Sequence, residues 1–153
     1  MNRIFDSTAP SATILIRIAV GAVFLSEGVQ KFLNPDDVGA GRFARIGIPN
    51  AEVMGPLVGT IEIVCGALVL LGLLTRVAVV PLIGIMVVAI ITTKIPILMG
   101  MDLGPFRVRQ LDDYGFWSMA HESRTDFAML LGSLFLLIVG AGRWSVDALV
   151  RRR

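Results

Sequence analysis

Four long apolar runs divide the chain, and each has the length of a membrane-crossing helix. A hydrocarbon core of roughly 30 Å needs about 20 helical residues. The runs cover about residues 12–32, 53–74, 77–95 and 126–142. Because each run is almost continuously apolar, the pattern predicts an all-α fold, a transmembrane four-helix bundle that occupies residues 1–153 as one domain.

Segments that contain polar residues, glycine or proline separate the four runs. Asn34 and Pro35 end the first run, because proline interrupts helical hydrogen bonding. Residues 72–76 leave room only for a tight turn, so the second and third helices are expected to be antiparallel neighbours. The connections over 36–52 and 96–125 are longer. Four crossings place these two longer loops on one membrane face and both termini on the other.

The first run carries three ionisable residues, Arg17, Glu27 and Lys31. On a helix with about 3.6 residues per turn, the three side chains share one face. Charged side chains inside a bilayer are costly, and they face the interior of a bundle, where they can pair with one another. We therefore expect this face of the first helix to point inward.

A stripe of small residues surrounds an acid in the second run. Gly55, Gly59, Glu62 and Gly66 fall within about 60° of one another on a helix. Small residues allow the backbone of a neighbouring helix to approach closely. The stripe therefore predicts a close contact between two helices, with Glu62 buried in its middle.

Depth along the runs separates the ionisable residues into two groups, of which the first is buried. With a rise of about 1.5 Å per residue, Glu62 lies near the midplane and Arg17 lies roughly 8 Å away, on the side of the termini. An extended Arg17 is therefore expected to pair with Glu62. Such a pair could clamp two helices or belong to a ligand site. Glu27 lies roughly 7 Å from the midplane, toward the loops.

The second group lies at the loop-side end of the runs. Lys31, Lys94 and Asp126 fall at that end, and His121 lies just outside it, so we expect them to ring one mouth of the bundle. Simpler roles stay open for each. Lys94 could extend to the lipid headgroups, and Glu27 with Lys31 could form an ordinary i, i+4 pair. His121 is compatible with either an interfacial loop residue or a proton carrier.

Composition agrees with a membrane protein. The 153 residues are 55% hydrophobic and 17% charged, and the mean hydropathy is +0.78, as expected for a chain surrounded by lipid. The net charge is only +2. The basic cluster Arg151–Arg153 indicates a membrane-surface or orientation signal rather than a nucleic-acid site. Together with Arg76 and Arg143, it predicts a multi-pass protein of the cell (plasma) membrane with cytoplasmic termini.

The chain holds one cysteine, Cys65, and one histidine, His121. A lone thiol cannot form an internal disulfide, which excludes dithiol exchange within this chain. One histidine cannot supply both axial ligands of a bis-histidine haem, and no Cys/His cluster has metal-ligand spacing. Neither haem nor metal is expected, so redox chemistry would need an organic cofactor or another subunit.

A series of short motifs follows the four runs. In chain order they are Arg17-x3-Gly21, Glu27-Gly28-x2-Lys31, Gly59-x2-Glu62-x3-Gly66, Leu71-Gly72-x2-Thr75-Arg76 and Gly140-Ala141-Gly142-Arg143-x-Ser145-x-Asp147. Together they resemble the DoxX family over about residues 14–148. The chain differs from the family pattern at Glu27, where many members carry histidine, and at Asp126, where glutamate is frequent.

The resemblance implies a four-helix integral membrane protein of a kind often associated with redox systems. Some members are linked to thiosulfate:quinone oxidoreductase or to quinol oxidation, and others to membrane complexes that handle thiol stress. The difference at Glu27 argues against carrying over a histidine-centred proton role. The resemblance is stronger evidence for the fold than for the activity.

Protonatable groups that face inward lead to one main functional hypothesis. The chain is predicted to be a membrane subunit of a redox complex, a quinone-linked oxidoreductase subunit that needs a partner. Quinone reduction takes up protons, and carbonyl oxygens need donors such as lysine or arginine. The site is therefore expected to bind a quinone or a similar lipophilic ligand. The candidate catalytic residues are Glu27 and Glu62, and the candidate ligand-binding residues are Arg17, Lys31, Lys94, Asp126 and His121.

Two other functions are compatible with the sequence. A non-catalytic scaffold or assembly subunit would use the same charges to hold helices together. A small transporter or proton pathway is less favoured, because four short helices leave little room for alternating access and no inverted repeat is visible. The expected partners are the lipid bilayer and either another protein or a second copy of this chain. No nucleic-acid partner is expected.

Overall fold

The computed structural model describes residues 9–151 of the chain. All regular secondary structure in this part is helical, and it contains no strand beyond an isolated bridge between Leu103 and Phe106. The elements are α1 (Thr13–Leu33), α2 (Ala40–Arg45), α3 (Ala51–Leu71), α4 (Thr75–Ala89), the π-helical turn η1 (Ile90–Lys94), α5 (Ile95–Met99), α6 (Phe116–Glu122), α7 (Arg124–Val139) and α8 (Val146–Arg151). The all-α prediction is confirmed.

Three of the predicted membrane spans form helices of sufficient length and apolar character. They are Thr13–Leu33, Ala51–Leu71 and Thr75–Met99, the last made by α4, η1 and α5 in succession. The fourth predicted run forms α7, which has 16 residues and therefore measures about 24 Å, less than the hydrocarbon core. A fourth crossing and the placement of both loops on one membrane face stay predictions.

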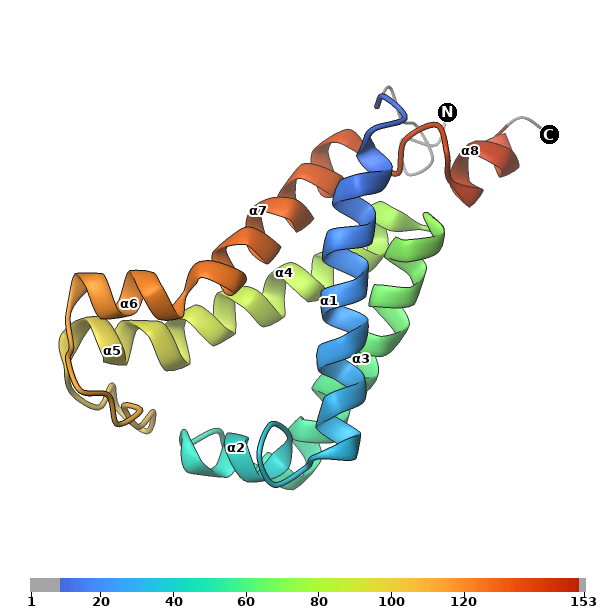
Figure 1. Cartoon of the computed structure of the whole chain (residues 1–153). Helices are drawn as coiled ribbons and strands as arrows, with labels where there is room; N and C mark the ends of the chain where they lie inside the picture. Colours follow the sequence, from blue (N-terminus) through green and yellow to red (C-terminus); the bar gives the residue numbers. More distant parts are fainter. Residues whose placement is uncertain (1–8, 152–153) are drawn as a thin grey trace.

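The helices form two arms that diverge from one end of the molecule (Figure 1). The first arm consists of α1 and α3, which pack along their length. The second arm consists of Thr75–Met99 together with α6 and α7. We call the end where the arms meet, at the α3–α4 turn and the start of α1, the closed end. The open end carries α2 and the segment 100–115.

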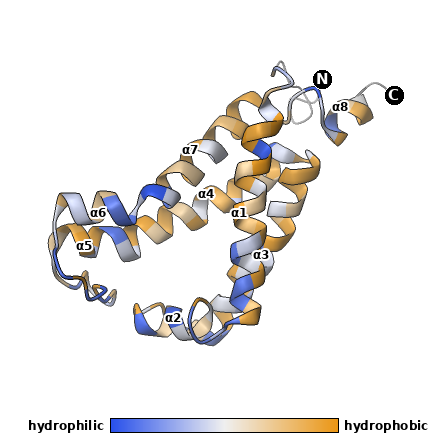
Figure 2. Cartoon of the chain, viewed as in Figure 1, coloured by the Kyte–Doolittle hydropathy of each residue, from blue (hydrophilic) through white to orange (hydrophobic). Residues whose placement is uncertain are grey.

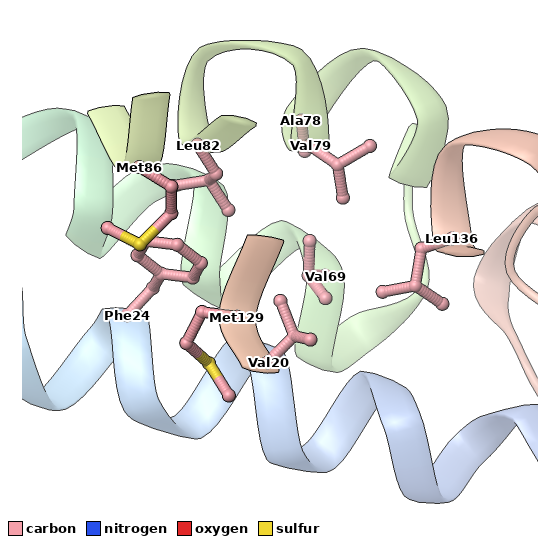
Figure 3. Close-up of a cluster of buried hydrophobic side chains, with 9 residues drawn as sticks. All are labelled: Val20, Phe24, Val69, Ala78, Val79, Leu82, Met86, Met129 and Leu136. Carbon is pink, nitrogen blue, oxygen red and sulfur yellow. The ribbon is translucent and has the colours of Figure 1, made fainter. Parts of the chain in front are cut away.

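A small apolar core joins the two arms, and α1, α3, α4 and α7 all contribute to it (Figure 3). Its buried side chains are Val20, Phe24, Val69, Ala78, Val79, Leu82, Met86, Met129 and Leu136. The long helices are mainly apolar along their length (Figure 2), and many of their apolar side chains are exposed. In a bilayer these surfaces contact lipid, and the helices associate through close packing rather than through exclusion of water.

Glycines set the close approach of α1 and α3. A Cβ at Gly21 would lie 2.9 Å from the Gly66 carbonyl oxygen, and a Cβ at Gly28 would lie 2.7 Å from that of Gly59. These gaps are shorter than real Cβ contacts, so side chains at these positions would push the helices apart. The predicted glycine stripe is confirmed as a helix contact. It also fixes the antiparallel register of the two helices.

Candidate functional site

Arg17 lies at the closed end rather than beside Glu62. The residue is 3% exposed. Its guanidinium donates hydrogen bonds to four backbone carbonyls, those of Val69, Leu70, Ala141 and Trp144. The last carbonyls of a helix lack helical partners and carry partial negative charge, which favours a cation there. Arg17 therefore caps α3 and ties it to the segment that follows α7. The predicted Arg17–Glu62 pair is wrong.

Asp147 forms a second tie at the closed end. This buried carboxylate accepts hydrogen bonds from the backbone N–H groups of Leu74 at 2.8 Å and Thr75 at 3.2 Å. The Asp147 N–H donates in turn to the Gly72 carbonyl, at 2.9 Å. A carboxylate at a helix N-terminus satisfies N–H groups that the helix leaves free. The last motif of the chain thus holds the α3–α4 turn and has a structural explanation.

Glu62 pairs with Lys31 across the contact between α1 and α3. Lys31 Nζ lies 2.7 Å from Glu62 Oε2 and 3.9 Å from Glu27 Oε2. The side chains of Lys31 and Glu62 are 9% and 3% exposed, whereas that of Glu27 is 48% exposed. The 2.7 Å distance makes Lys31 the close partner of Glu62. A carboxylate has more than one acceptor site, so Glu62 can also accept a hydrogen bond from a ligand.

A second lysine–carboxylate pair lies in the other arm. Lys94 Nζ is 3.1 Å from Asp126 Oδ2 and donates to the Glu122 carbonyl at 2.8 Å. The two side chains are 9% and 22% exposed. The pair joins the end of η1 to the first turn of α7. Sequence reasoning placed Lys94 and Asp126 at one mouth of the bundle, and the structure agrees, with Lys94 buried rather than extended toward lipid headgroups.

A π-helical turn accounts for the position of Lys94. Pro96 has no N–H group, and its ring disfavours the regular helical bond to the residue four positions back. The Ile95 N–H instead reaches the Ile90 carbonyl, five residues back. The wider turn changes the direction of the side chains that follow it, and such turns are frequent at functional sites. Within it, Thr92 and Lys94 are both buried.

One cavity of about 530 Å³ lies between the arms. Five of the seven candidate site residues line it: Glu27, Lys31, Glu62, Lys94 and Asp126. Its other walls are mainly apolar and come from α1, α2, α3, α4, η1 and α7. The depth argument therefore assigned most of these charges to the right end of the molecule. The depth argument failed to pair Glu62 with Lys31, because the extended side chain of Lys31 reaches deeper than its own Cα.

Arg17 and His121 lie outside this cavity. Arg124 Nη2 lies 3.1 Å from His121 Nε2, and Arg124 Nε donates to the His121 carbonyl. Both contacts are exposed. Nearby, Arg109 forms an exposed ion pair with Glu122 at 3.1 Å. His121 does not line the cavity, and its role in binding or proton transfer stays a prediction.

The two long connections meet at the open end. Side chains of α2 and the residues after it, including Phe43, Ile46 and Ile48, line the cavity. The Arg107 N–H donates to the Ile46 carbonyl at 3.1 Å. This contact links the two arms through their loops. No pattern in the sequence indicated that these apolar residues face a cavity.

The site suits an organic ligand. Among residues 9–151, no group of three or more His, Cys, Asp or Glu side chains could hold a metal ion. The cavity lining instead combines apolar walls with two ammonium groups, one guanidinium group and three carboxylates. Such a lining can bind an amphipathic molecule, with its polar oxygens at the ionisable residues and its apolar body against the helices.

The sequence is similar to one protein family and to two known proteins. The DoxX family profile matches residues 12–95. "Uncharacterized membrane protein Rv3486" of Mycobacterium tuberculosis is 54% identical over 151 residues, which cover 99% of this chain and 88% of that protein. "Putative oxidoreductase CatD" of Bacillus subtilis is 27% identical over 150 residues, which cover 98% of this chain and 92% of that protein. No solved structure gives a significant match.

Proposed function

We propose that this chain, which belongs to the DoxX family of membrane proteins, is a membrane subunit of a redox complex. In this proposal, the central cavity binds a quinone or a similar lipophilic ligand. The name of one similar protein, "Putative oxidoreductase CatD" of Bacillus subtilis, is in keeping with a redox role. The main support comes from the side chains of the cavity itself.

The observation that carries the proposal is the presence of two lysine–carboxylate pairs in one cavity. Lys31 with Glu62 belongs to the first arm, and Lys94 with Asp126 belongs to the second. Each pair places N–H donors beside a carboxylate acceptor. A quinone has two oxygens on opposite sides of a ring, which accept hydrogen bonds when oxidised and donate them as hydroxyls when reduced. Paired donors and acceptors suit oxygens that alternate in this way.

The size and walls of the cavity also suit such a ligand. Small-molecule sites typically occupy about 300–1,000 Å³ and are mostly apolar, with a few polar groups that fix orientation. The cavity here measures about 530 Å³, and its apolar lining includes Phe24, Ile85 and Met129. A ring and a short part of an apolar tail can therefore be surrounded by protein, while a longer tail would extend into lipid.

The two glutamates of the first arm would handle protons. A bound quinone supplies two-electron redox chemistry, and the electrons would come from a partner protein. Glu62 is buried beside Lys31, whereas the Glu27 side chain is half exposed and lines the same cavity. Glu27 can thus exchange protons with water near the mouth, and Glu62 can hold one deeper in the site. Arg17 has no place in this chemistry, because its donors all hold backbone carbonyls.

A substitution at Glu62 tests the proposal. The protein would be purified in a mild detergent, and its lipid extract would be analysed for bound quinones. We expect the wild-type protein to retain quinone and Glu62→Gln to lose it at normal protein abundance, because the amide removes the charge beside Lys31. Glu52→Gln is the matched control, since Glu52 is exposed on the same helix and does not line the cavity. A wild-type protein without quinone, or equal retention in Glu62→Gln, contradicts the proposal.

A scaffold role is the second candidate, and one observation favours it. Each lysine–carboxylate pair joins two helices, α1 to α3 and η1 to α7, so the pairs can serve to hold the arms in shape. If the chain is a scaffold, Glu62→Gln lowers protein abundance or complex assembly. The protein that still folds then holds as much quinone per molecule as the wild type, or neither protein holds any. Bound quinone per folded protein, measured with abundance, separates the two functions.

The bilayer is the environment of the three long apolar helices. We further propose the plasma membrane as location, with both termini in the cytoplasm, and a partner protein or a second copy as the remaining component of the complex. The proposed orientation rests on Arg76, Arg143 and the cluster Arg151–Arg153. The side chains of this cluster lie outside the described part of the chain.

A further inference from the structure

The ionisable side chains that line the cavity balance one another. Three cationic and three carboxylate side chains take part, so their formal charges cancel. The cationic side chains are Arg42, Lys31 and Lys94, and the carboxylates are Glu27, Glu62 and Asp126. An additional charge in a low-dielectric site is costly unless it gains a partner of opposite sign. An anionic ligand would leave this set of side chains with a net negative charge.

Gly84 is exposed and lies where the cavity wall is open, so a ligand body could contact α4 there. It lines the cavity from α4, and a Cβ built there would have no heavy atom within 4 Å. Pro81, Ile85 and Val88 line the cavity from the same face of the helix, as their spacing requires. The glycines at the α1–α3 contact differ, because a Cβ there would collide with backbone. Helix packing therefore does not explain the missing side chain at Gly84.

We propose that the cavity selects an electrically neutral ligand with hydrogen-bond acceptors at both ends of its head group, and that Gly84 provides the space for its apolar ring. This inference rests on the proposed function and defines its ligand more closely. Lys31 and Lys94 each donate to one acceptor while they keep their carboxylate partners. The ring then lies against the face of α4 that Pro81 and Gly84 form. Fatty acids and other lipophilic anions are excluded as ligands of this site.

The first test compares two naphthoquinones of nearly equal size. Dimethylnaphthoquinone is neutral, whereas in phthiocol one methyl group is replaced by a hydroxyl that is ionised at neutral pH. Equilibrium binding would be measured with the full chain in lipid nanodiscs. We expect dimethylnaphthoquinone to bind at least roughly tenfold more tightly, because it adds no charge to a balanced site. Equal or tighter binding of phthiocol overturns the inference and leaves the proposed function standing. Failure of both compounds to bind overturns the proposed function itself.

The second test fills the space at Gly84. Gly84→Leu is expected to weaken dimethylnaphthoquinone binding at least about tenfold, and Gly84→Ala is expected to weaken it less, because the smaller side chain fills less of the cavity. Val80→Leu is the matched control, since Val80 is exposed on the same helix outside the cavity, and it should bind as the wild type does. If folded Gly84→Leu and Gly84→Ala proteins both bind like the wild type, the ring does not lie at Gly84.

Discussion

Arg17 shows that a buried charge in a membrane helix can serve the fold alone. Its guanidinium lies among backbone carbonyls at the end of α3 and in the segment after α7. The planar fork of arginine can donate in several directions at once, which a lysine ammonium at the end of a flexible chain cannot reproduce. The charge therefore satisfies helix-end carbonyls that would otherwise have no partner.

We predict that Arg17→Lys destabilises the protein by about 2–3 kcal/mol, because several buried carbonyls lose their donor. Thermal unfolding in detergent measures the effect, with Arg143→Lys as control, since Arg143 is exposed near the same end. Quinone bound per folded molecule should stay unchanged. An Arg17→Lys protein that melts like the wild type but binds no quinone would place Arg17 in the ligand site after all.

The sequence was sufficient to predict which charges gather at one mouth, but not which residues pair. Lys31, Lys94 and Asp126 were placed correctly because position along a helix determines depth. Pairing across helices depends on their register, which depth does not give. The glycine positions define the register of α1 against α3. An antiparallel pairing of Gly21 with Gly66 and of Gly28 with Gly59 places Arg17 beside Leu70, as observed.

At the scale of elements, close glycine packing holds the first arm together. A Cβ at Gly66 would lie 2.8 Å from the Leu25 backbone nitrogen and 3.0 Å from the Gly21 carbonyl oxygen. Backbone atoms cannot move aside as the end of a flexible side chain can, so the two helices would have to separate along the contact. Their separation would also weaken the Lys31–Glu62 pair, which spans the same contact.

We predict that Gly66→Ala destabilises the protein by about 1–3 kcal/mol through overpacking, whereas Gly84→Ala is neutral or slightly stabilising, because alanine favours a helix and meets no neighbour at Gly84. Melting temperatures of the two variants, prepared in parallel, make the comparison. Equal melting temperatures for the two variants would contradict the assigned roles of the two glycines.

Hydropathy predicted the long helices well and the short ones poorly. The first three runs match their helices within a few residues, because apolar length alone determines a membrane span. The short helices α2, α6 and α8 have six or seven residues and depend on contacts with distant segments, such as the Asp147 tie to Leu74 and Thr75. The π turn before Pro96 likewise required the structure, since the sequence showed only a proline.

At the scale of the whole molecule, the cavity arises because the two arms diverge from a tightly tied closed end. Arg17 and Asp147 fix that end, and the loops meet again at the open end through Ile46 and Arg107. The sequence predicted a bundle but not a cavity within it, because the angle between helices depends on how side chains of both arms pack. Five of the seven candidate residues nevertheless line this space.

The number of crossings determines where the termini lie. If α7 crosses the membrane as a fourth span, reporters fused before Met1 and after Arg153 should both report the cytoplasm. Paired fusions to a cytoplasm-active and an exterior-active reporter measure this directly. Termini on opposite sides would mean that α7 does not cross, and two exterior termini would reverse the orientation.

Photolabelling tests most directly whether the cavity between the arms holds the ligand. A photoreactive naphthoquinone would be added to membranes that contain the protein, and labelled residues would be identified by mass spectrometry. We predict labels on cavity residues such as Phe24 and Met86, which excess dimethylnaphthoquinone should remove. Labels confined to lipid-facing residues such as Leu15 and Ile138, which are 67% and 74% exposed, and unaffected by the competitor, would contradict a ligand site in this cavity.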